Sequence, residues 1–109
     1  ASPHRLIQML MEGALEKIAE AKGNMLNQYI AKKCKDIGTA INIIANLQAC
    51  LNKEAGGEVA ENLDSLYDYM CRRLVIANSC NDETILDEVM SLMVEIKSGW
   101  DGIAEKVRQ

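Results

Sequence analysis

The sequence contains no phenylalanine and only one histidine, one proline and one tryptophan in 109 residues. A metal centre inside a helical bundle uses histidines from two helices, and a catalytic triad places its histidine deep in the fold. The lone histidine, His4, falls in the first turn of a predicted helix and suits neither role. We therefore predict no catalytic residue, no metal site and no cofactor, and we expect a protein that is not an enzyme.

Long apolar runs and an excess of positive charge are also absent. No run approaches the roughly 20 apolar residues that cross a bilayer, and no signal segment opens the sequence. Sixteen acidic residues outnumber twelve basic residues, which gives a formal net charge of -4. Because a nucleic-acid site needs a basic surface, we predict no nucleic-acid partner. From the lack of a membrane-spanning run and of a signal segment, we predict no membrane insertion and a cytoplasmic location.

The cysteines do not form the CxxC pair that would indicate a zinc or redox site. The four cysteines are Cys34, Cys50, Cys71 and Cys80. Because free cysteine packs as a small apolar side chain, we expect these thiols to be buried, reduced and free of metal. A disulfide or a zinc site is the alternative.

What the sequence does contain is four amphipathic helical patterns separated by short turn signals. Ser2 and Pro3 are typical of a helix N-cap and first helical position, and paired glycines at 56 and 57 disfavour continued helix. We predict helices over residues 3–26, 29–52, 58–78 and 82–107, with turns at 24–28, 54–58 and 78–82. The short connections predict an all-α, antiparallel up-down-up-down four-helix bundle, a single domain over residues 1–109.

Each predicted helix has one apolar stripe at helical spacing, which we assign to the core. The first stripe comprises Ile7, Leu10, Met11, Ala14, Ile18, Ala21 and Met25. The second comprises Ile30, Cys34, Ile37, Ile41, Ile44, Gln48 and Leu51. The third comprises Val59, Leu63, Leu66, Met70, Leu74 and Ala77. The fourth comprises Ile85, Val89, Leu92, Met93, Ile96, Trp100 and Ile103.

The second and third predicted helices have more apolar surface than one core face needs. A second apolar line on the second helix widens its apolar surface to more than half of the circumference, and two residues of the third helix flank an arginine away from the core stripe. The candidate partner-binding residues are Ala40, Ile43, Leu47, Cys50, Tyr69, Arg73 and Ile76. We expect them to form a groove for an amphipathic helix of a partner, with a covering loop or a homodimer contact as the alternative.

This assignment predicts the effect of buried charge. Leu47→Asp and Ile76→Asp should leave the bundle folded, whereas Ile44→Asp or Leu66→Asp should unfold it, because an unpaired buried carboxylate destabilises a small domain by several kcal/mol. Tyr67, near the edge of the third stripe, is predicted to pack in the core.

One segment carries a family resemblance. Leu66-Tyr67-Asp68-Tyr69-Met70, followed by Arg72-Arg73-Leu74, Ala77-Asn78 and Asn81-Asp82, resembles the signature of the bacterial flagellin export chaperones, the FliS family. Matches at Ser2-Pro3, Met9-Leu10, Ile43-Ile44, Leu51-Asn52, Glu88-Val89 and Trp100 extend the resemblance over nearly the whole chain. Family members usually carry a tyrosine-containing segment ahead of the Ser-Pro start, and the 109 residues contain no counterpart of it.

The resemblance implies a chaperone built as an antiparallel helical bundle. Such a protein would bind the C-terminal segment of newly made flagellin in the cytoplasm and stop its premature polymerisation. It would then present the flagellin to the flagellar type III export machinery. The disordered, amphipathic character of such a segment agrees with the spare apolar surface.

The alternative from another functional class is a helical phosphotransfer or adaptor domain that acts through His4. Four-helix phosphotransfer domains place an exposed histidine in mid-helix beside small and basic residues, and His4 lacks that setting. Phosphate on His4 after incubation with a phosphorylated response regulator would favour this alternative.

Overall fold

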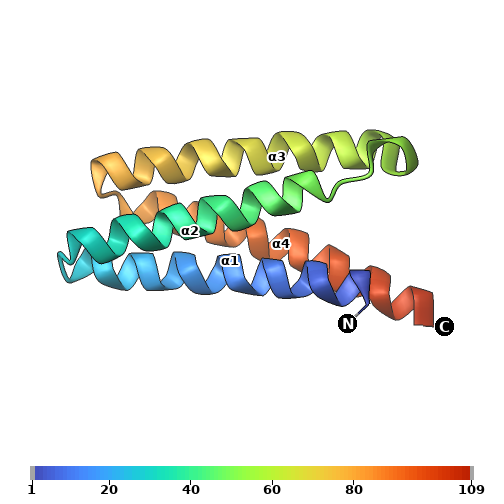
Figure 1. The fold of residues 1–109 in the computed structure, drawn as a ribbon, viewed down its shortest axis with the longest axis horizontal. Helices are drawn as coiled ribbons and strands as arrows, with labels where there is room; N and C mark the ends of the chain where they lie inside the picture. The colour runs from blue at the N-terminus through green and yellow to red at the C-terminus, as the bar shows by residue number, and fades with distance from the viewer. Residues whose placement is uncertain (1, 109) are drawn as a thin grey trace.

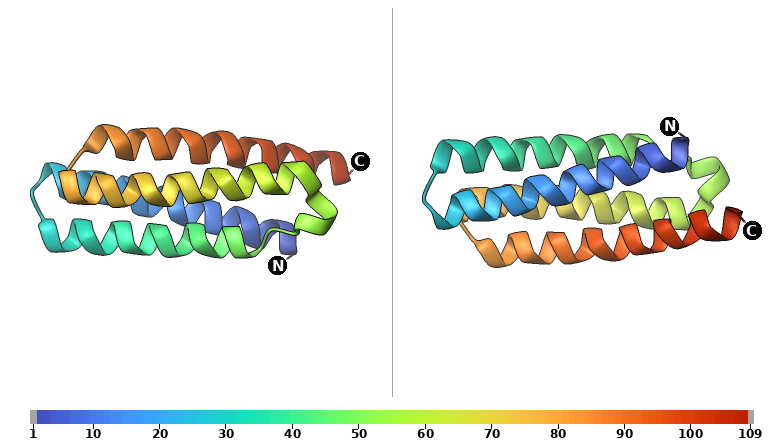
Figure 2. Two further views of the ribbon diagram at one scale, coloured as in Figure 1. Left: turned by 90° about the horizontal axis from the view of Figure 1, so that it is seen from above. Right: turned by 90° about the horizontal axis from the view of Figure 1, so that it is seen from below.

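The computed structural model describes the backbone of residues 2–108 and the side chains of residues 2–103. Four helices follow one another: α1 (Pro3–Leu26), α2 (Ile30–Ala49), α3 (Lys53–Cys80) and α4 (Glu83–Arg108). Each helix runs antiparallel to the next along a bundle 47 Å long (Figure 1). Helices α1 and α3 both pack against α2 and α4, so the four close into an up-down-up-down bundle (Figure 2). The described backbone contains no strand, which confirms the predicted all-α fold.

The start of α1 forms as its sequence signals predict. The Ser2 hydroxyl accepts a hydrogen bond from the Arg5 N–H at 3.1 Å, and Pro3 occupies the first helical turn, where a missing N–H loses no hydrogen bond. The other end of α1 is closed by the Asn27 N–H, which donates to the Gly23 carbonyl at 3.1 Å. The first helix therefore has the predicted bounds.

The connection between α2 and α3 differs from the predicted loop. Helix α2 ends at Ala49, which frees Asn52 to cap α3, and the Asn52 side chain accepts a hydrogen bond from the Ala55 N–H at 3.1 Å. The first turn of α3 thus begins at Lys53, inside the segment predicted to be non-helical. The break falls instead at Gly57, whose φ of 52° and ψ of -127° are accessible to glycine alone among common residues.

A buried lysine ties α2 to the turn between α3 and α4. The Lys33 ammonium donates to the Asn78 carbonyl at 2.9 Å and to the Asn81 side-chain oxygen at 2.6 Å. Asn81 is in the left-handed conformation that ends α3, and its neighbour Asp82 accepts from the Thr84 N–H at 2.9 Å to open α4. Lys33 is therefore a satisfied buried cation at a helix C-terminus, where the helix dipole favours positive charge.

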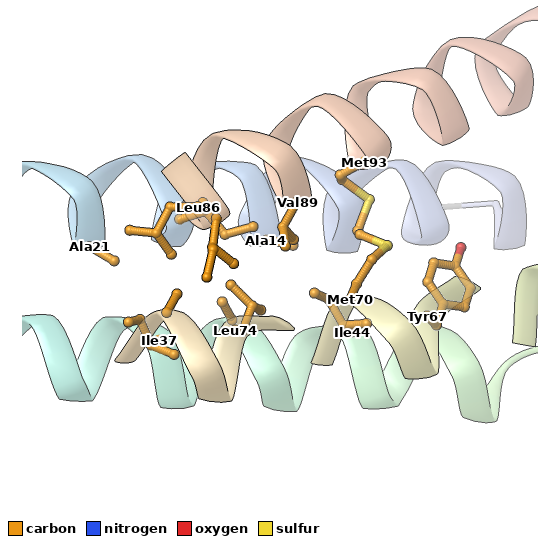
Figure 3. Close-up of a cluster of buried hydrophobic side chains, with 14 of the residues drawn as sticks. Ala14, Ala21, Ile37, Ile44, Tyr67, Met70, Leu74, Leu86, Val89 and Met93 are labelled. Atoms are coloured by element: carbon orange, nitrogen blue, oxygen red, sulfur yellow. The ribbon is translucent and has the colours of Figure 1, made fainter. Parts of the chain in front are cut away.

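The core runs along the bundle axis and is built from aliphatic and methionine side chains of all four helices (Figure 3). Its fully buried members include Met11, Ile18, Ile37, Ile44, Leu47, Met70, Leu74, Leu86, Val89 and Met93. Tyr67 is also buried, as predicted. The four predicted stripes are correct over most of their length, but four members are exposed: Ile30 and Cys34 of α2, Val59 of α3 and Ile103 of α4.

The buried face of α2 differs from the predicted one. Its buried residues are Lys33, Asp36, Ile37, Ala40, Ile44 and Leu47. Lys33 and Asp36 replace the exposed Ile30 and Cys34 because both polar groups have partners, and the Asn24 amide donates to the Asp36 carboxylate at 2.6 Å. Paired polar groups thus occupy positions that an apolar pattern assigns to solvent.

Candidate binding groove

An apolar groove lies at the end of the bundle where α1 starts and α4 ends, the end that holds both labelled termini in Figure 1. It encloses about 580 Å³, and we call it the end groove. All four helices line it: Ile7 and Met11 of α1, Leu47 of α2 with the C-cap residue Cys50, Val59, Leu63 and Tyr67 of α3, and Ile96, Trp100 and Ile103 of α4. The groove therefore presents mainly apolar side chains to an incoming molecule.

The break at Gly57 shapes one rim of the end groove. The turn before it contributes Ala55 and Gly56 to the lining, and a Cβ added at Gly56 would lie 2.7 Å from the Ala60 Cβ. This turn therefore packs closely against α3 while Val59, just beyond the break, is left 67% exposed. Ile103 of α4 is 50% exposed, so the groove has accessible apolar side chains on both α3 and α4.

Tyr67 lies on the buried side of the end groove. Its side chain is only 2% exposed, and burial raises the pKa of its phenol to about 12. Leu47 and Met11 line the same wall and are also buried. The inner wall is thus continuous with the hydrophobic core.

A second hollow opens on the outer side of the α1 start. It encloses about 810 Å³, and its lining comprises Pro3, His4, Leu6, Ile7, Met9, Leu10, Cys50 and Trp100. Leu6 and Met9 are half-exposed, which adds two large apolar side chains to the surface beside the end groove. Ile7, Cys50 and Trp100 line both spaces and form the wall between them.

Trp100 of α4 contacts the start of α1 in two ways. Its indole ring stacks on His4 with ring centroids 4.6 Å apart, and its N–H donates to the His4 carbonyl at 3.1 Å. Next to it, the Gln8 amide donates to Asp101 at 2.6 Å, and Lys97 donates to the same carboxylate at 2.7 Å. These two donors, Lys97 first, lower the pKa of Asp101. The contacts of Trp100 and Asp101 therefore hold the start of α1 against α4 beside the two hollows.

Few polar groups reach the end groove. Asn52 and Glu95 lie in its lining, and the remaining side chains are nearly all apolar. Among residues 2–103, no group of three or more histidine, cysteine, aspartate or glutamate side chains is placed to hold a metal ion. None of the described helices is long and apolar enough to span a membrane. The arrangement suits the apolar face of a peptide or helix, since such grooves take up aliphatic anchors.

The structure corrects the position of two candidate residues on α2. Ala40 and Leu47 are 0% and 1% exposed, so the prediction that they lie outside the core is wrong. Ile43 is half-buried against α1, where its Cδ1 lies 3.5 Å from the position of a Cβ on Gly13. Leu47 and Cys50 nevertheless line the end groove, at its inner wall and its rim.

The three candidate residues on α3 lie away from the end groove, on the side that faces α4. Tyr69 donates its hydroxyl to one oxygen of Glu88 at 2.6 Å, and the Arg73 Nε donates to the other oxygen at 2.9 Å. These bonds, with that from Tyr69 first, lower the pKa of Glu88. Ile76 is 41% exposed. The predicted site is therefore divided between two surfaces, and the partner-binding role of its residues stays a prediction.

Two further findings concern single residues, and the first contradicts the expected burial of the thiols. Cys34, Cys50 and Cys80 are exposed, and only Cys71 is partly buried, so most thiols lie outside the core. His4 is half-buried against Trp100, and its Nε2 is buried without a hydrogen-bond partner among the described residues. A phosphotransfer histidine needs an accessible ring nitrogen, and the Nε2 atom of His4 is buried.

Several groove residues were assigned to the core by the sequence pattern. Val59, Leu63, Ile96, Trp100 and Ile103 all belong to predicted core stripes. The signal that distinguishes the two most exposed of them is position: Val59 lies near the start of α3, two residues after Gly57, and Ile103 lies near the end of α4. An apolar stripe that continues to a helix end leaves its last members without a covering layer.

A four-helix bundle with an apolar groove at one end has the form of a helical binding protein. The model of the family described as flagellar protein FliS matches residues 1–107. The chain belongs to this family, which consists of chaperones and not of enzymes, in agreement with the prediction that it has no catalytic role.

Three relatives place the chain within this family. It is 56% identical over 104 residues to the flagellar secretion chaperone FliSB of Pseudomonas aeruginosa, covering 95% of this chain and 82% of the relative. It is 46% identical to the flagellar secretion chaperone FliS of Vibrio cholerae, over 94% of this chain and 76% of the relative. The FliS of Salmonella typhimurium is 44% identical, over 97% and 79% of the respective chains.

Proposed function

We propose that this chaperone binds the C-terminal segment of flagellin in the cytoplasm, with the apolar face of that segment in the end groove. Binding prevents premature polymerisation, and the complex is delivered to the flagellar type III export apparatus. The observation that carries the proposal is the exposed apolar lining of the groove, above all Val59 and Ile103. A family of flagellar secretion chaperones needs a surface of this kind for an aggregation-prone cargo.

The energetics of the groove favour an amphipathic cargo helix. Burying the exposed half of an aliphatic side chain contributes about 1 kcal/mol. At least half of the side-chain surface is exposed at Leu6, Met9, Val59 and Ile103. A disordered segment must lose conformational entropy on binding, so several such anchors are needed at once. The end groove and the adjoining hollow together provide them.

A pair of valine variants on α3 tests the proposal. Val59 lines the end groove, whereas Val75, 57% exposed on the same helix, does not. We expect Val59→Asp to weaken binding of a flagellin C-terminal peptide by tenfold or more, about 1.4 kcal/mol, in isothermal titration calorimetry. Val75→Asp should bind as the wild type does.

Equal affinities of Val59→Asp and wild type, with both proteins folded, would place the cargo elsewhere. The same variants should differ in their ability to delay polymerisation of purified flagellin. A secretion assay in cells would then report on delivery to the export apparatus, which the peptide assay does not measure.

The surface near Tyr69, Arg73 and Ile76 is a second candidate contact for the same cargo. Ile76 is exposed next to the Tyr69–Glu88–Arg73 cluster, so a cargo that leaves the end groove along α3 would meet it. Ile76→Asp should then reduce affinity less than Val59→Asp does. An unchanged affinity would restrict the cargo to the end groove.

A second copy of the chain is the other candidate occupant of the end groove. Sedimentation velocity of the wild type and of Val59→Asp distinguishes the two occupants. A dimer that dissociates only in the Val59→Asp variant would mean that the groove is a homodimer contact in the absence of cargo.

A further inference from the structure

The turn between α1 and α2 lies at the other end of the bundle (Figure 1). Three large apolar side chains in and beside this turn are exposed. Leu26, Tyr29 and Ile30 are 60%, 54% and 52% exposed. Turns between helices usually contain glycine, asparagine, aspartate, serine or proline, which solvate well. These three side chains contribute little to the core, so the fold does not account for them. We call them the turn patch.

Hydrogen bonds hold the backbone of the turn patch. The Tyr29 N–H donates to the Asn24 carbonyl at 2.8 Å, and the Asn27 side-chain amide donates to the Gly23 carbonyl at 2.9 Å. Gln28 has a positive φ of 61°, which turns the chain within three residues between the two helices. A surface fixed in this way loses less conformational entropy when a partner binds.

The charge beside the turn patch is positive. Helix α2 contains three basic residues and one acidic residue, whereas in each of the other helices acidic residues equal or outnumber basic ones. The acidic residue, Asp36, is buried and accepts a hydrogen bond from Asn24. Lys32 places its ammonium 5.2 Å from the Tyr29 ring centroid, and neither Lys32 nor Lys35 forms an ion pair with a described residue.

We propose that the turn patch is a docking site for an acidic, aliphatic segment of a second protein, distinct from the cargo in the end groove. Aliphatic side chains of the segment cover Leu26, Tyr29 and Ile30, and its carboxylates pair with Lys32 and Lys35. The bundle is 47 Å long, and the two sites lie at opposite ends, so both partners bind at once.

Charge farther from the patch favours a peptide over an anionic membrane as the partner. The α3–α4 turn lies at the same end of the bundle, tied to α2 through Lys33, and it contains Asp82 and Glu83. The whole chain has a net charge of -4. A lipid surface would face all of these charges, whereas a short peptide meets only the patch and its two lysines.

A competitive selection tests the proposal. A displayed library of random short peptides is selected on the full chain, with the Tyr29→Ser/Lys32→Glu double variant in solution as competitor. The recovered peptides should be acidic and rich in leucine, isoleucine or valine. They should bind the double variant at least tenfold more weakly and bind Val59→Asp as tightly as the wild type.

Three results would overturn the proposal: no peptide that distinguishes the two proteins, discriminating peptides that are neutral or basic, or patch-dependent sedimentation with phosphatidylserine vesicles. Both substituted residues are exposed, so the double variant should fold. If it does not, amide chemical shifts of the wild type with a selected acidic peptide decide the question. Shifts confined to residues 24–35 support the site, and shifts elsewhere overturn it. Binding of the selected peptides to Val59→Asp shows whether the turn patch acts independently of the end groove.

Discussion

The Trp100 indole lies nearly parallel to the His4 imidazole, with an interplanar angle of 8°, and its N–H donates to the backbone carbonyl of His4. The Trp100 side chain thus contacts both the side chain and the main chain of His4, in the first turn of α1. Because Trp100 also lines both hollows, the shape of the candidate site and the anchoring of α1 depend on the same residue.

Substitution of Trp100 should therefore separate its two interactions. Trp100→Phe retains stacking but loses the hydrogen bond, which should lower the free energy of unfolding by about 1 kcal/mol. Trp100→Ala also removes the packing, for a loss of about 2 to 4 kcal/mol. Urea denaturation followed by circular dichroism measures both. Equal losses for the two variants would mean that the ring itself contributes little.

Aspartate at positions 47 and 76 should have opposite outcomes. Leu47 is 1% exposed, so Leu47→Asp buries an unpaired carboxylate and should unfold the bundle or lower its stability by about 4 kcal/mol. Ile76→Asp, at a 41% exposed position, should remain folded. Thermal melts of the two variants check this expectation. A stable Leu47→Asp protein would show that this part of the core can open to water.

Acid should weaken the tie between α3 and α4. The hydrogen bonds from Tyr69 and Arg73 lower the pKa of Glu88 from its ordinary 4.5. A carboxyl group with a lowered folded-state pKa stabilises the protein above its unfolded pKa, and this contribution disappears as the pH falls through the folded value. Glu88→Gln should therefore lower the melting temperature at pH 7 and match the wild type more closely at pH 3. Glu61→Gln, at an exposed position, should follow the wild type throughout.

Two glycines should respond oppositely to alanine. Gly57 has a φ of 52°, so Gly57→Ala is strained and should destabilise the chain by about 1 to 2 kcal/mol. Gly38 lies within α2, and an added Cβ would meet no atom within 4 Å beyond the helix's own backbone, so Gly38→Ala should stabilise by up to about 1 kcal/mol. Chemical denaturation of both variants gives the comparison. Stabilisation by Gly57→Ala would mean that the turn before it is not fixed as described.

The thiols should divide into fast and slow groups. Cys34, Cys50 and Cys80 are exposed, whereas burial raises the pKa of the Cys71 thiol. Ellman's reagent should titrate three thiols quickly in the native protein and the fourth only slowly or after denaturation, because the thiolate is the reactive form. Fewer than four reactive thiols under denaturing conditions, or stoichiometric zinc in the purified protein, would contradict the predicted reduced, metal-free state.

The sequence predicted the helices better than the faces they bury. Capping at Ser2 and the signals around Asn81 depend on neighbouring residues, so the number, type and order of the helices followed from local patterns. The buried face of α2 did not follow from local patterns, because Lys33 and Asp36 are buried with hydrogen-bond partners 45 and 12 residues away in the sequence. An apolar pattern contains no information about such pairings.

The candidate site was harder to predict for a related reason. The wide apolar surface of the second predicted helix indicated a binding site on α2, but Ala40 and Leu47 of that helix are buried in the core. The accessible apolar residues are instead those whose stripe extends past the last covering layer, such as Val59 and Ile103. Where a bundle ends depends on how far each neighbouring helix reaches, which is a property of the whole fold.

Trp100 is the only tryptophan of the chain, so the wall of the candidate site contains its own optical probe. Its ring borders the end groove on one side and the outer hollow on the other, and it stacks on the His4 imidazole. A partner that fills either space should shift the emission spectrum, and one that displaces His4 should also change the emission intensity. Occupancy can therefore be followed by intrinsic fluorescence in the unlabelled wild-type protein.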